Sequence, residues 1–487
     1  MKLPLGIDAP IGMIEPLLIV SITGIVLLLV DLLLPPGRKH LSVYLALAGV
    51  VYAIIRSAAQ WGASQVGYAG MVSLDNLSTL FNLLFLSSTG AVMLLSMPFL
   101  RKENVEHSEY YALLLFATSG MMILASGLDL ITLFLGIEVL SISLYILAGY
   151  RRDSEASNEA AMKYFLLGAF ASSVLLYGIA LVYGATGTTN LLKISEIVGG
   201  TSGSLPEGLL YAGVALILVG LAFKVAAAPF HMWTPDVYEG APTPITAFLS
   251  AGPKAAAFAA LLRTFFIGFG PIQAEWASVL SIIAFLTMTI GNVAAIAQTN
   301  VKRMLAYSSI AHSGYVLIGI VAGGGVGGAA AVFYLIAYVA MNLGAFAVIV
   351  LLEAKGERGD ELKDYAGLGF RYPLIGALLS LFMISLSGIP PTVGFVGKLY
   401  LFGAAVQSGH VWLAVAGVLN SAISVFYYLR LMVLMYMRDA QESMPAIRIP
   451  LALALVLLVA AAGTLWPGIW PGAWLDAARE GMRALFS

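Results

Sequence analysis

The chain alternates between long apolar runs and short polar segments along most of its length. A helix needs about 20 residues to cross the hydrocarbon core of a bilayer, and the apolar runs have that length. Lipid offers the backbone no hydrogen-bond partners, so runs of this length indicate helices rather than strands. The pattern predicts about fourteen membrane-spanning helices, near residues 13–34, 41–60, 77–99, 109–127, 129–149, 161–184, 208–230, 242–265, 273–296, 301–322, 326–352, 372–406, 411–437 and 449–470.

The seventh and twelfth predicted helices contain residues that interrupt a helix. Pro229 stops the seventh helix, and Pro390 and Pro391 divide the twelfth. Each also contains one central lysine, Lys224 before the first break and Lys398 after the second. Transporters place broken helices at their binding sites, and this order suits two halves of inverted topology. We therefore expect both breaks to lie near a functional site.

Composition supports a membrane protein and excludes several other classes. Of the 487 residues, 60% are hydrophobic and only 10% are charged, too few to cover the surface of a soluble protein of this size. The net charge of -1 and the lack of a basic run do not indicate a nucleic-acid partner. The chain has no cysteine, so it has no thiolates for an iron–sulfur cluster. Its five histidines are scattered without the spacing of metal ligands.

Basic residues in the loops predict the orientation. About fifteen lysines and arginines fall in loops on one side of the predicted bundle, and about six fall on the other. Positively charged loops face the cytoplasm, so both termini are expected on the outer side. The first apolar run lacks the features of a cleaved signal and is expected to be a permanent span. At the C-terminus, 474–486 has one apolar helical face, which indicates an interfacial amphipathic helix; a polar tail is the alternative.

Four charged residues lie deep within apolar runs: Glu138, Lys224, Lys254 and Lys398. Ionisable groups at this depth are costly and usually mark functional sites. Three lysines and one carboxylate suggest a proton relay. The proton affinity of a buried lysine depends on a nearby carboxylate, so a pair formed by Glu138 and Lys224 would be adjustable.

Each of these residues also has a purely structural interpretation. Glu138 could be a protonated packing residue, or it could form a static buried salt bridge with Lys224. Lys254 and Lys398 could extend toward an interface and leave only their alkyl stems in the apolar layer.

Three further residues are weaker candidates for proton transfer. Lys163 begins the sixth predicted helix, and extension of its side chain toward the interface would explain it equally well. His231 and His312 titrate near neutral pH and could relay protons. A lone histidine in a membrane is more often a hydrogen-bonded packing residue.

The segments around these residues resemble the antiporter-like, proton-pumping membrane subunits of respiratory complex I. The similar segments are 223–244 (FKVAAAPFHMWTPDVYEGAPTP), 387–398 (SGIPPTVGFVGK) and the predicted helix around Glu138. Relatives of this family occur in multisubunit Na⁺/H⁺ antiporters and membrane-bound hydrogenases. Within the group, 160–188 most resembles the subunit N type. Lys398 agrees with that type, because the subunit M type has a glutamate there.

The resemblance implies an all-α integral membrane fold of about fourteen transmembrane helices, with two inverted five-helix repeats and broken helices 7 and 12. It divides the chain into 1–108 (helices 1–3), 109–265 (first repeat), 273–437 (second repeat) and 449–487 (helix 14 and a C-terminal interfacial helix). It also implies roles for the buried residues: Glu138 and Lys224 as the coupling pair, Lys254 as the connecting lysine, Lys398 on the path to the far side and His312 on a hydrated central axis.

The implied function is proton translocation by a membrane subunit of NADH:quinone oxidoreductase, driven by quinone reduction in a bacterial inner membrane. No cofactor is expected on this chain; NAD, FMN, iron–sulfur clusters and quinone would belong to partner subunits. The expected partners are the other membrane and peripheral subunits, especially neighbouring antiporter-like subunits, together with membrane lipid. The alternatives are a subunit of a Na⁺/H⁺ antiporter or membrane-bound hydrogenase, and a purely structural membrane scaffold.

Overall fold

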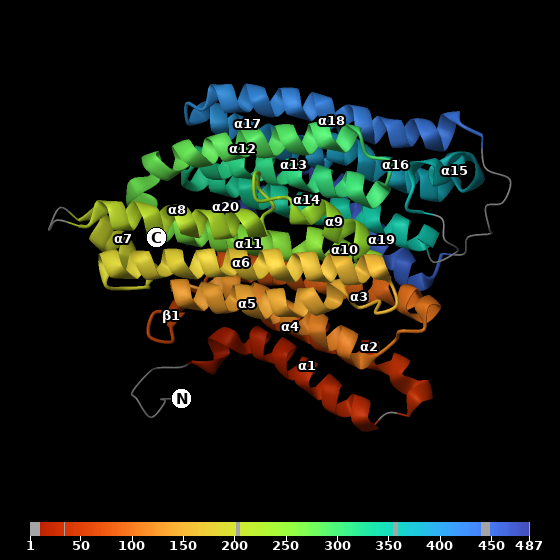
Figure 1. Cartoon of the computed structure of the whole chain (residues 1–487), viewed down its shortest axis with the longest axis horizontal. Coiled ribbons are helices and arrows are strands. Elements are labelled where there is room, and N and C mark those ends of the chain that lie inside the picture. Colours follow the sequence, from red (N-terminus) through yellow and green to blue (C-terminus); the bar gives the residue numbers. More distant parts are fainter. Residues whose placement is uncertain (1–9, 34, 201–204, 354–358, 440–448, 487) are drawn as a thin grey trace.

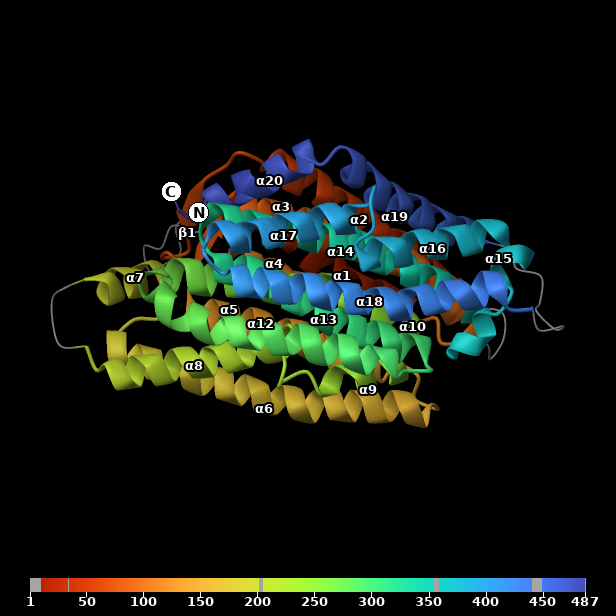
Figure 2. The same cartoon turned by 90° about the horizontal axis from the view of Figure 1, so that it is seen from above.

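The computed structural model describes residues 10–33, 35–200, 205–353, 359–439 and 449–486. Long helices lie side by side along one direction and form a bundle (Figures 1 and 2). Within the described residues, 13 helical segments are long and apolar enough to cross a membrane. The predicted all-α, multi-pass membrane fold is therefore confirmed.

The N-terminal part of the bundle ends with a group of short helices. Its α-helices are α1 (Glu15–Leu33), α2 (Ser42–Ala59), α3 (Asn76–Glu103), α4 (Ser108–Ser126), α5 (Leu130–Ala148), α6 (Glu155–Thr186), α7 (Leu191–Gly199), α8 (Glu207–Lys224), α9 (Trp233–Gly240), α10 (Thr243–Ser250) and α11 (Gly252–Arg263). Between α2 and α3, β1 (Gln65–Gly67) and β2 (Val72–Leu74) form a short antiparallel hairpin.

The C-terminal part contains the longest interior helix, α14. Its α-helices are α12 (Gln273–Ile296), α13 (Val301–Ala322), α14 (Gly324–Glu353), α15 (Leu368–Arg371), α16 (Pro373–Ser387), α17 (Val393–Gln407), α18 (Val411–Met437), α19 (Leu451–Ile469) and α20 (Gly472–Arg483). The predicted twelfth helix is divided into α16 and α17, each of 15 residues. The predicted count of about fourteen spans and the division into two repeats stay predictions.

Three of the predicted membrane helices are interrupted. The seventh was expected to stop at Pro229, but α8 already ends at Lys224 and the chain turns through Ala226, which has a φ of 59°. Proline restricts the residue before it and removes a backbone donor, so the helix resumes only at α9. The eighth is divided into α10 and α11 at Ala251, close to Lys254. The twelfth is broken after Ser387, where Gly388 has a φ of 85°.

The central helices are buried on nearly all sides. Almost every residue of α11, α13 and α14 is buried, whereas α1 exposes most of its surface. A helix that is apolar all round belongs in the centre of a bundle, and exposed apolar residues such as those of α1 suit contact with lipid. The interior helices also carry Lys254 and His312, so these two residues lie within the protein.

The C-terminal segment is helical and packs on the bundle. Residues 472–483 form α20, and its interfacial position stays a prediction. Leu475, Ala478 and Met482 are buried, and α20 packs against α3 and α14. The preceding helix reaches the break of the twelfth span, because Gly468 lies beside the backbone of Pro391. The apolar face of α20 is therefore covered by protein rather than by lipid.

The count of basic loop residues made from sequence included Arg263 on the less basic side of the bundle, and its placement in a loop was wrong. It is the last residue of α11 and is fully buried. Its guanidinium donates to both carboxylate oxygens of Asp75, at 2.8 and 2.7 Å, and to the carbonyl of Ala125. Asp75 also caps α3 by accepting from the backbone N–H of Ser78 at 2.7 Å. This ion pair joins the start of α3 to the end of the helix that carries Lys254.

Candidate functional site

Lys224 is the last residue of α8 and is surrounded by aromatic rings. Its Nζ atom lies 5.8 Å from the ring centroid of Tyr145, 5.9 Å from that of Tyr164 and 5.6 Å from that of Phe223. Ring faces attract a cation within about 6 Å. The ammonium also donates a hydrogen bond of 2.7 Å to the hydroxyl of Ser141 on α5. Among the residues that the structure describes, these contacts hold the lysine without a direct counter-ion.

The predicted direct pair between Glu138 and Lys224 is not formed among the described residues. Glu138 lies on α5 one turn before Ser141, and positions three apart share a helix face. Its carboxylate acts electrostatically on Lys224, but the Oε1 atom is buried without a hydrogen-bond partner in the described structure. The ammonium of Lys224 donates its hydrogen bond to the hydroxyl of Ser141 instead. The two charges are therefore neighbours that are held apart.

Lys254 reaches the centre of the bundle. It is only 3% exposed, and its Nζ atom donates to the carbonyl of Ser309 on α13 at 2.9 Å and to the hydroxyl of the same residue. Both bonds point into the protein, which excludes the alternative that this side chain extends to an interface.

Lys398 is held by the end of the broken twelfth helix. The side chain is 4% exposed, and Nζ donates to the carbonyls of Leu386 and Ser387 at 3.0 and 2.9 Å and to the hydroxyl of Ser421 at 2.9 Å. The last carbonyls of a helix have no partner within it. The break of α16 therefore creates the acceptors that bind the lysine.

His312 lies between these two lysines. Its Nδ1 atom is 2.7 Å from the hydroxyl of Tyr334, and its Nε2 atom is 3.0 Å from that of Tyr428. Both Lys254 and Lys398 act electrostatically on the imidazole. Tyr315, whose ring centroid is 5.6 Å from that of His312, also lies 4.9 Å from the Nζ atom of Lys398.

One face of α13 thus connects Lys254 to Lys398. Ser309, His312 and Tyr315 follow each other at intervals of three residues, which places them on the same side of the helix. Ser309 binds Lys254. The ring of His312 contacts that of Tyr315, and the ammonium of Lys398 lies over the ring of Tyr315. The α13 face, defined by these three residues, brings the surroundings of Lys254 and Lys398 onto one buried helix.

Helix ends give the three lysines different electrostatic surroundings. The C-terminal end of a helix carries partial negative charge and the N-terminal end partial positive charge. Lys224 ends α8, and Lys398 binds the last carbonyls of α16, so both ammonium groups meet a favourable helix end. Lys254 is in the first turn of α11, where the helix end opposes a cation. Of the three lysines, Lys254 therefore has the helix end that stabilises its ammonium charge least.

The other two weaker candidates, Lys163 and His231, lie apart from the α13 face. Lys163 pairs with Glu159 and Asp236, each at 2.7 Å, and remains 41% exposed. Arg303 binds the same Asp236 at 2.7 Å. His231 lies in the turn between α8 and α9, half-buried, and its Nδ1 atom has no hydrogen-bond partner among the described residues. Proton transfer by either residue stays a prediction.

Several residues of the site were not found from sequence. Tyr334, Tyr428, Tyr164 and Ser421 contact His312 or one of the lysines, yet each is an ordinary residue in an apolar run. Tyr334 and Tyr338 lie four residues apart in 326–352, which was the one visible signal of a polar helix face. In the described chain, no hydrogen bond joins the surroundings of Lys224 to Lys254.

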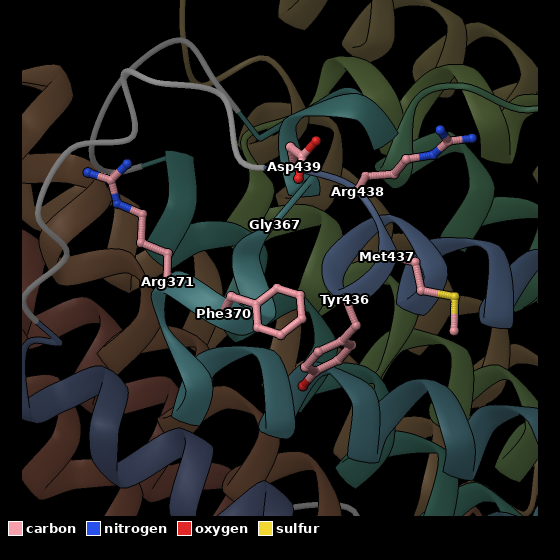
Figure 3. A pocket seen from close by; sticks show the side chains of 7 residues that line it. All are labelled: Gly367, Phe370, Arg371, Tyr436, Met437, Arg438 and Asp439. Carbon is pink, nitrogen blue, oxygen red and sulfur yellow. The ribbon is translucent and has the colours of Figure 1, made fainter.

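A cavity of about 540 Å³ lies elsewhere, at the ends of α15 and α18 (Figure 3). Phe370 and Tyr436 face each other in it, with ring centroids 6.1 Å apart, while Arg371 and Arg438 extend to either side. None of the buried lysines lines this cavity. The site is therefore defined by side chains in the core, not by a surface cavity.

Comparisons with known proteins agree on the family. Residues 127–424 match the family described as NADH:quinone oxidoreductase/Mrp antiporter, TM. NADH-quinone oxidoreductase subunit N of Trichlorobacter lovleyi is 50% identical over 475 residues, which cover 98% of this chain and 97% of that protein. A chain of respiratory complex I from Thermus thermophilus, solved with bound aureothin, is 36% identical with a TM-score of 0.80, and the match covers 95% of this chain and 98% of that one.

The fold is also found in a more distant assembly. A chain of the Mrp complex from Dietzia sp. is 22% identical with a TM-score of 0.86, and the match covers 98% of both chains. That similarity shows a common fold only. The sequence identity to subunit N, 50% and 36% in the two relatives above, is greater, and the resemblance inferred from sequence is confirmed. The chain belongs to the NADH-quinone oxidoreductase subunit N family.

Proposed function

We propose that this chain is a proton-translocating membrane subunit of an NADH:quinone oxidoreductase. The observation that carries the proposal is the α13 face, on which Ser309, His312 and Tyr315 connect Lys254 to Lys398 within the apolar core. Ionisable groups within a membrane bundle usually mark an ion or proton path. Membership of the subunit N family supports the same function.

In this proposal, protons move along the chain's own side chains. The Nζ atom of Lys254 holds a proton, and the ring nitrogens of His312 and water pass it toward Lys398. The hydroxyls of Tyr334 and Tyr428 fix the imidazole between the lysines, because each is hydrogen-bonded to one ring nitrogen. Water must complete the path where no described side chains are hydrogen-bonded, notably between Lys224 and Lys254.

In this proposal, Glu138 regulates how strongly Lys224 holds its proton. Their charges are close but unpaired, since Ser141 occupies the ammonium. A movement that brings the carboxylate into contact would stabilise the lysine charge, and a movement that separates them would release the proton. Transfer of one charge against 100 mV requires about 2.3 kcal/mol. A change of buried ion-pair geometry can supply this amount, because charges interact strongly in a low-dielectric interior.

The remaining assignments concern the surroundings of the chain. From the basic loops we infer that the ends of α3 and α14 face the cytoplasm and that both termini lie outside, in a bacterial inner membrane. The partners are the other membrane and peripheral subunits of the complex, especially neighbouring antiporter-like subunits. The chain carries no redox centre, and NADH, FMN, iron–sulfur clusters and quinone belong to those partners. Within the complex, the chain acts as part of a translocase.

The test is proton translocation by the assembled complex in proteoliposomes, measured as protons moved per NADH oxidised. Lys224→Ala, Glu138→Ala and Lys254→Ala are expected to assemble and to lower this ratio. Lys193→Ala, which removes an exposed lysine on α7, serves as the matched control and leaves it unchanged. Unchanged pumping in all three variants refutes the proposal. Sodium-dependent proton flux from the isolated chain would favour the antiporter alternative instead.

A further inference from the structure

A second group of ionisable residues lies at one end of the bundle, outside the lysine path. A cavity of about 490 Å³ opens where α3 and α14 end and where α6, α10 and α13 begin. Figures 1 and 2 place α9 and α10 toward this end. The cavity, here called the vestibule, is lined by both signs of charge, including Lys102, Arg151, Glu239, Lys302 and Glu353. Lys102, Arg151 and Lys302 belong to the side of the bundle that the sequence predicts to be rich in basic residues.

Glu353 is the carboxylate at the inner wall of the vestibule. Its side chain is 15% exposed and accepts a hydrogen bond of 2.6 Å from the hydroxyl of Thr243, the first residue of α10. Lys302 lies 3.6 Å from it and also 3.3 Å from Asp360. One lysine thus serves two carboxylates. The Glu353 carboxylate can therefore exchange a proton with water in the vestibule while it contacts the buried helix α10.

Incompletely bonded hydroxyls lie between the vestibule and Lys254. Tyr238 immediately precedes the vestibule wall formed by 239–243 and is fully buried. Tyr338 on α14 is 2% exposed. Both hydroxyls lie near Ser309, the residue that binds Lys254, but within the described structure neither reaches the geometry of a well-formed hydrogen bond. Buried hydroxyls normally have a partner, so two incompletely bonded hydroxyls near one polar site are groups to which an ordered water could bind.

We propose that the vestibule takes up protons at Glu353 and delivers them to Lys254 through water held by the hydroxyls of Tyr238 and Tyr338. The inference rests on the proposed function and names its uptake route. A proton from water binds the Glu353 carboxylate, which then returns to its charged form by giving the proton to the water inside. Each water or hydroxyl accepts one proton and gives up another, and the Lys254 amine becomes an ammonium. No electrons are transferred. Thr243 positions Glu353 and does not carry the proton.

The first experiment removes the two hydroxyls and keeps the rings. The Lys254-dependent share of pumping is defined as the wild-type ratio of protons to NADH minus that of Lys254→Ala, measured in the assembled complex. The double variant Tyr238→Phe with Tyr338→Phe is expected to reduce this share at least about tenfold, within the range of proton-transfer contributions. Tyr111→Phe is the matched control, since Tyr111 is also fully buried with an unpaired hydroxyl but lies on α4.

The outcomes separate the two proposals. If Lys254→Ala lowers pumping but the double variant pumps as the wild type does, the uptake route is wrong and the proposed function stands. If Lys254→Ala alone pumps fully, the Lys254-dependent share is zero and the uptake route to it is overturned; if Lys224→Ala and Glu138→Ala also pump fully, the proposed function fails as well. Glu353→Gln keeps the acceptor for Thr243 but cannot carry the proton, so it should lose the same share. Glu353→Asp should restore part of it, which a merely structural role would not predict.

A second measurement does not depend on removing a buried group. The chain contains no cysteine, so Ala156→Cys introduces a single thiol at an exposed position that lines the vestibule. A charged, membrane-impermeant thiol reagent added on the side of Lys102 should label the chain and lower pumping. The complex with the cysteine-free chain, treated identically, is the control for labelling of other subunits. Labelling without any loss of pumping overturns the uptake route.

Discussion

Lys398 lies directly over the ring of Tyr315, with its Nζ atom 4.9 Å from the ring centroid. Tyr315 belongs to α13, which also binds Lys254 through Ser309. A single rigid helix therefore positions both lysines, although they come from different broken helices. A shift of α13 would change the surroundings of both charges together. This arrangement explains how distant ammonium groups can be coupled without direct contact.

The ring of Tyr315 should be required for the function of Lys398. Tyr315→Leu removes a desolvated cation–π contact, which is worth about 2 kcal/mol in favourable cases. We expect reduced pumping at unchanged assembly, measured as protons moved per NADH oxidised. Tyr315→Phe retains the ring and loses only the hydroxyl that accepts from Asn292 at 3.0 Å. It should pump more than Tyr315→Leu; equal losses would show that the hydroxyl, and not the ring, is important.

Gly388 should be intolerant of a side chain. Its φ of 85° favours glycine, and a Cβ atom there would lie 2.8 Å from the Cδ atom of Lys398. We expect Gly388→Ala to displace the lysine, to lower the thermal unfolding temperature and to reduce pumping. Gly403→Ala on α17 is the matched control, because a Cβ atom there has open space and alanine favours a helix. The prediction is contradicted if the two variants behave alike.

The buried pair of Arg263 and Asp75 should be a major source of stability. Arg263→Met leaves the Asp75 carboxylate buried and unpaired, and loss of one partner of a buried pair costs about 3–5 kcal/mol. We expect a large fall in the free energy of unfolding, measured on the purified complex or chain in detergent. Adding Asp75→Asn should recover part of the loss. Arg56→Ala, which breaks a partly exposed pair with Glu15 at 2.7 Å, should have little effect.

The same pair predicts a dependence of stability on pH. Burial by itself would raise the pKa of the Asp75 carboxyl, but the charge and hydrogen bonds of Arg263 outweigh it, and the pKa lies below the ordinary 3.8. A carboxyl with a lowered pKa in the folded state adds stability that is complete above its unfolded pKa and is lost as the pH falls through its folded pKa. Unfolding curves should therefore show an Asp75-dependent loss only below about pH 4. In Asp75→Asn this acid-dependent component should be absent; an identical profile would contradict the prediction.

The proposed movement of the Lys224 ammonium between Ser141 and Glu138 can be tested separately. Ser141→Ala removes the acceptor that holds Lys224 at 2.7 Å. The ammonium should then move toward Glu138 and form the direct pair that this structure lacks. We expect pumping to fall, because a permanently closed pair no longer adjusts the lysine, while assembly is unchanged. Ser173→Ala on the exposed face of α6 is the control. Wild-type pumping in Ser141→Ala would show that the separation of the charges is not used.

The sequence by itself determined the membrane class, the approximate positions of two helix breaks and four of the charges within the bundle, but not the buried pair of Arg263 and Asp75. These features depend on local chemistry: apolar runs must be helical in lipid, proline and glycine interrupt helices, and a lysine in an apolar run is conspicuous. The two motifs around Lys224 and Lys398 were enough to indicate the family.

Only the tertiary structure decided which groups these charges contact. Ser141 rather than Glu138 binds Lys224, and the hydroxyls of Tyr334 and Tyr428 hold His312. Those contacts join helices far apart in the sequence, and hydroxyl residues are too common in membrane helices to be singled out in advance. The position of α20 was also undetermined, because an amphipathic helix buries its apolar face equally well on lipid or on a neighbouring helix. Packing against α3 and α14 settled that choice.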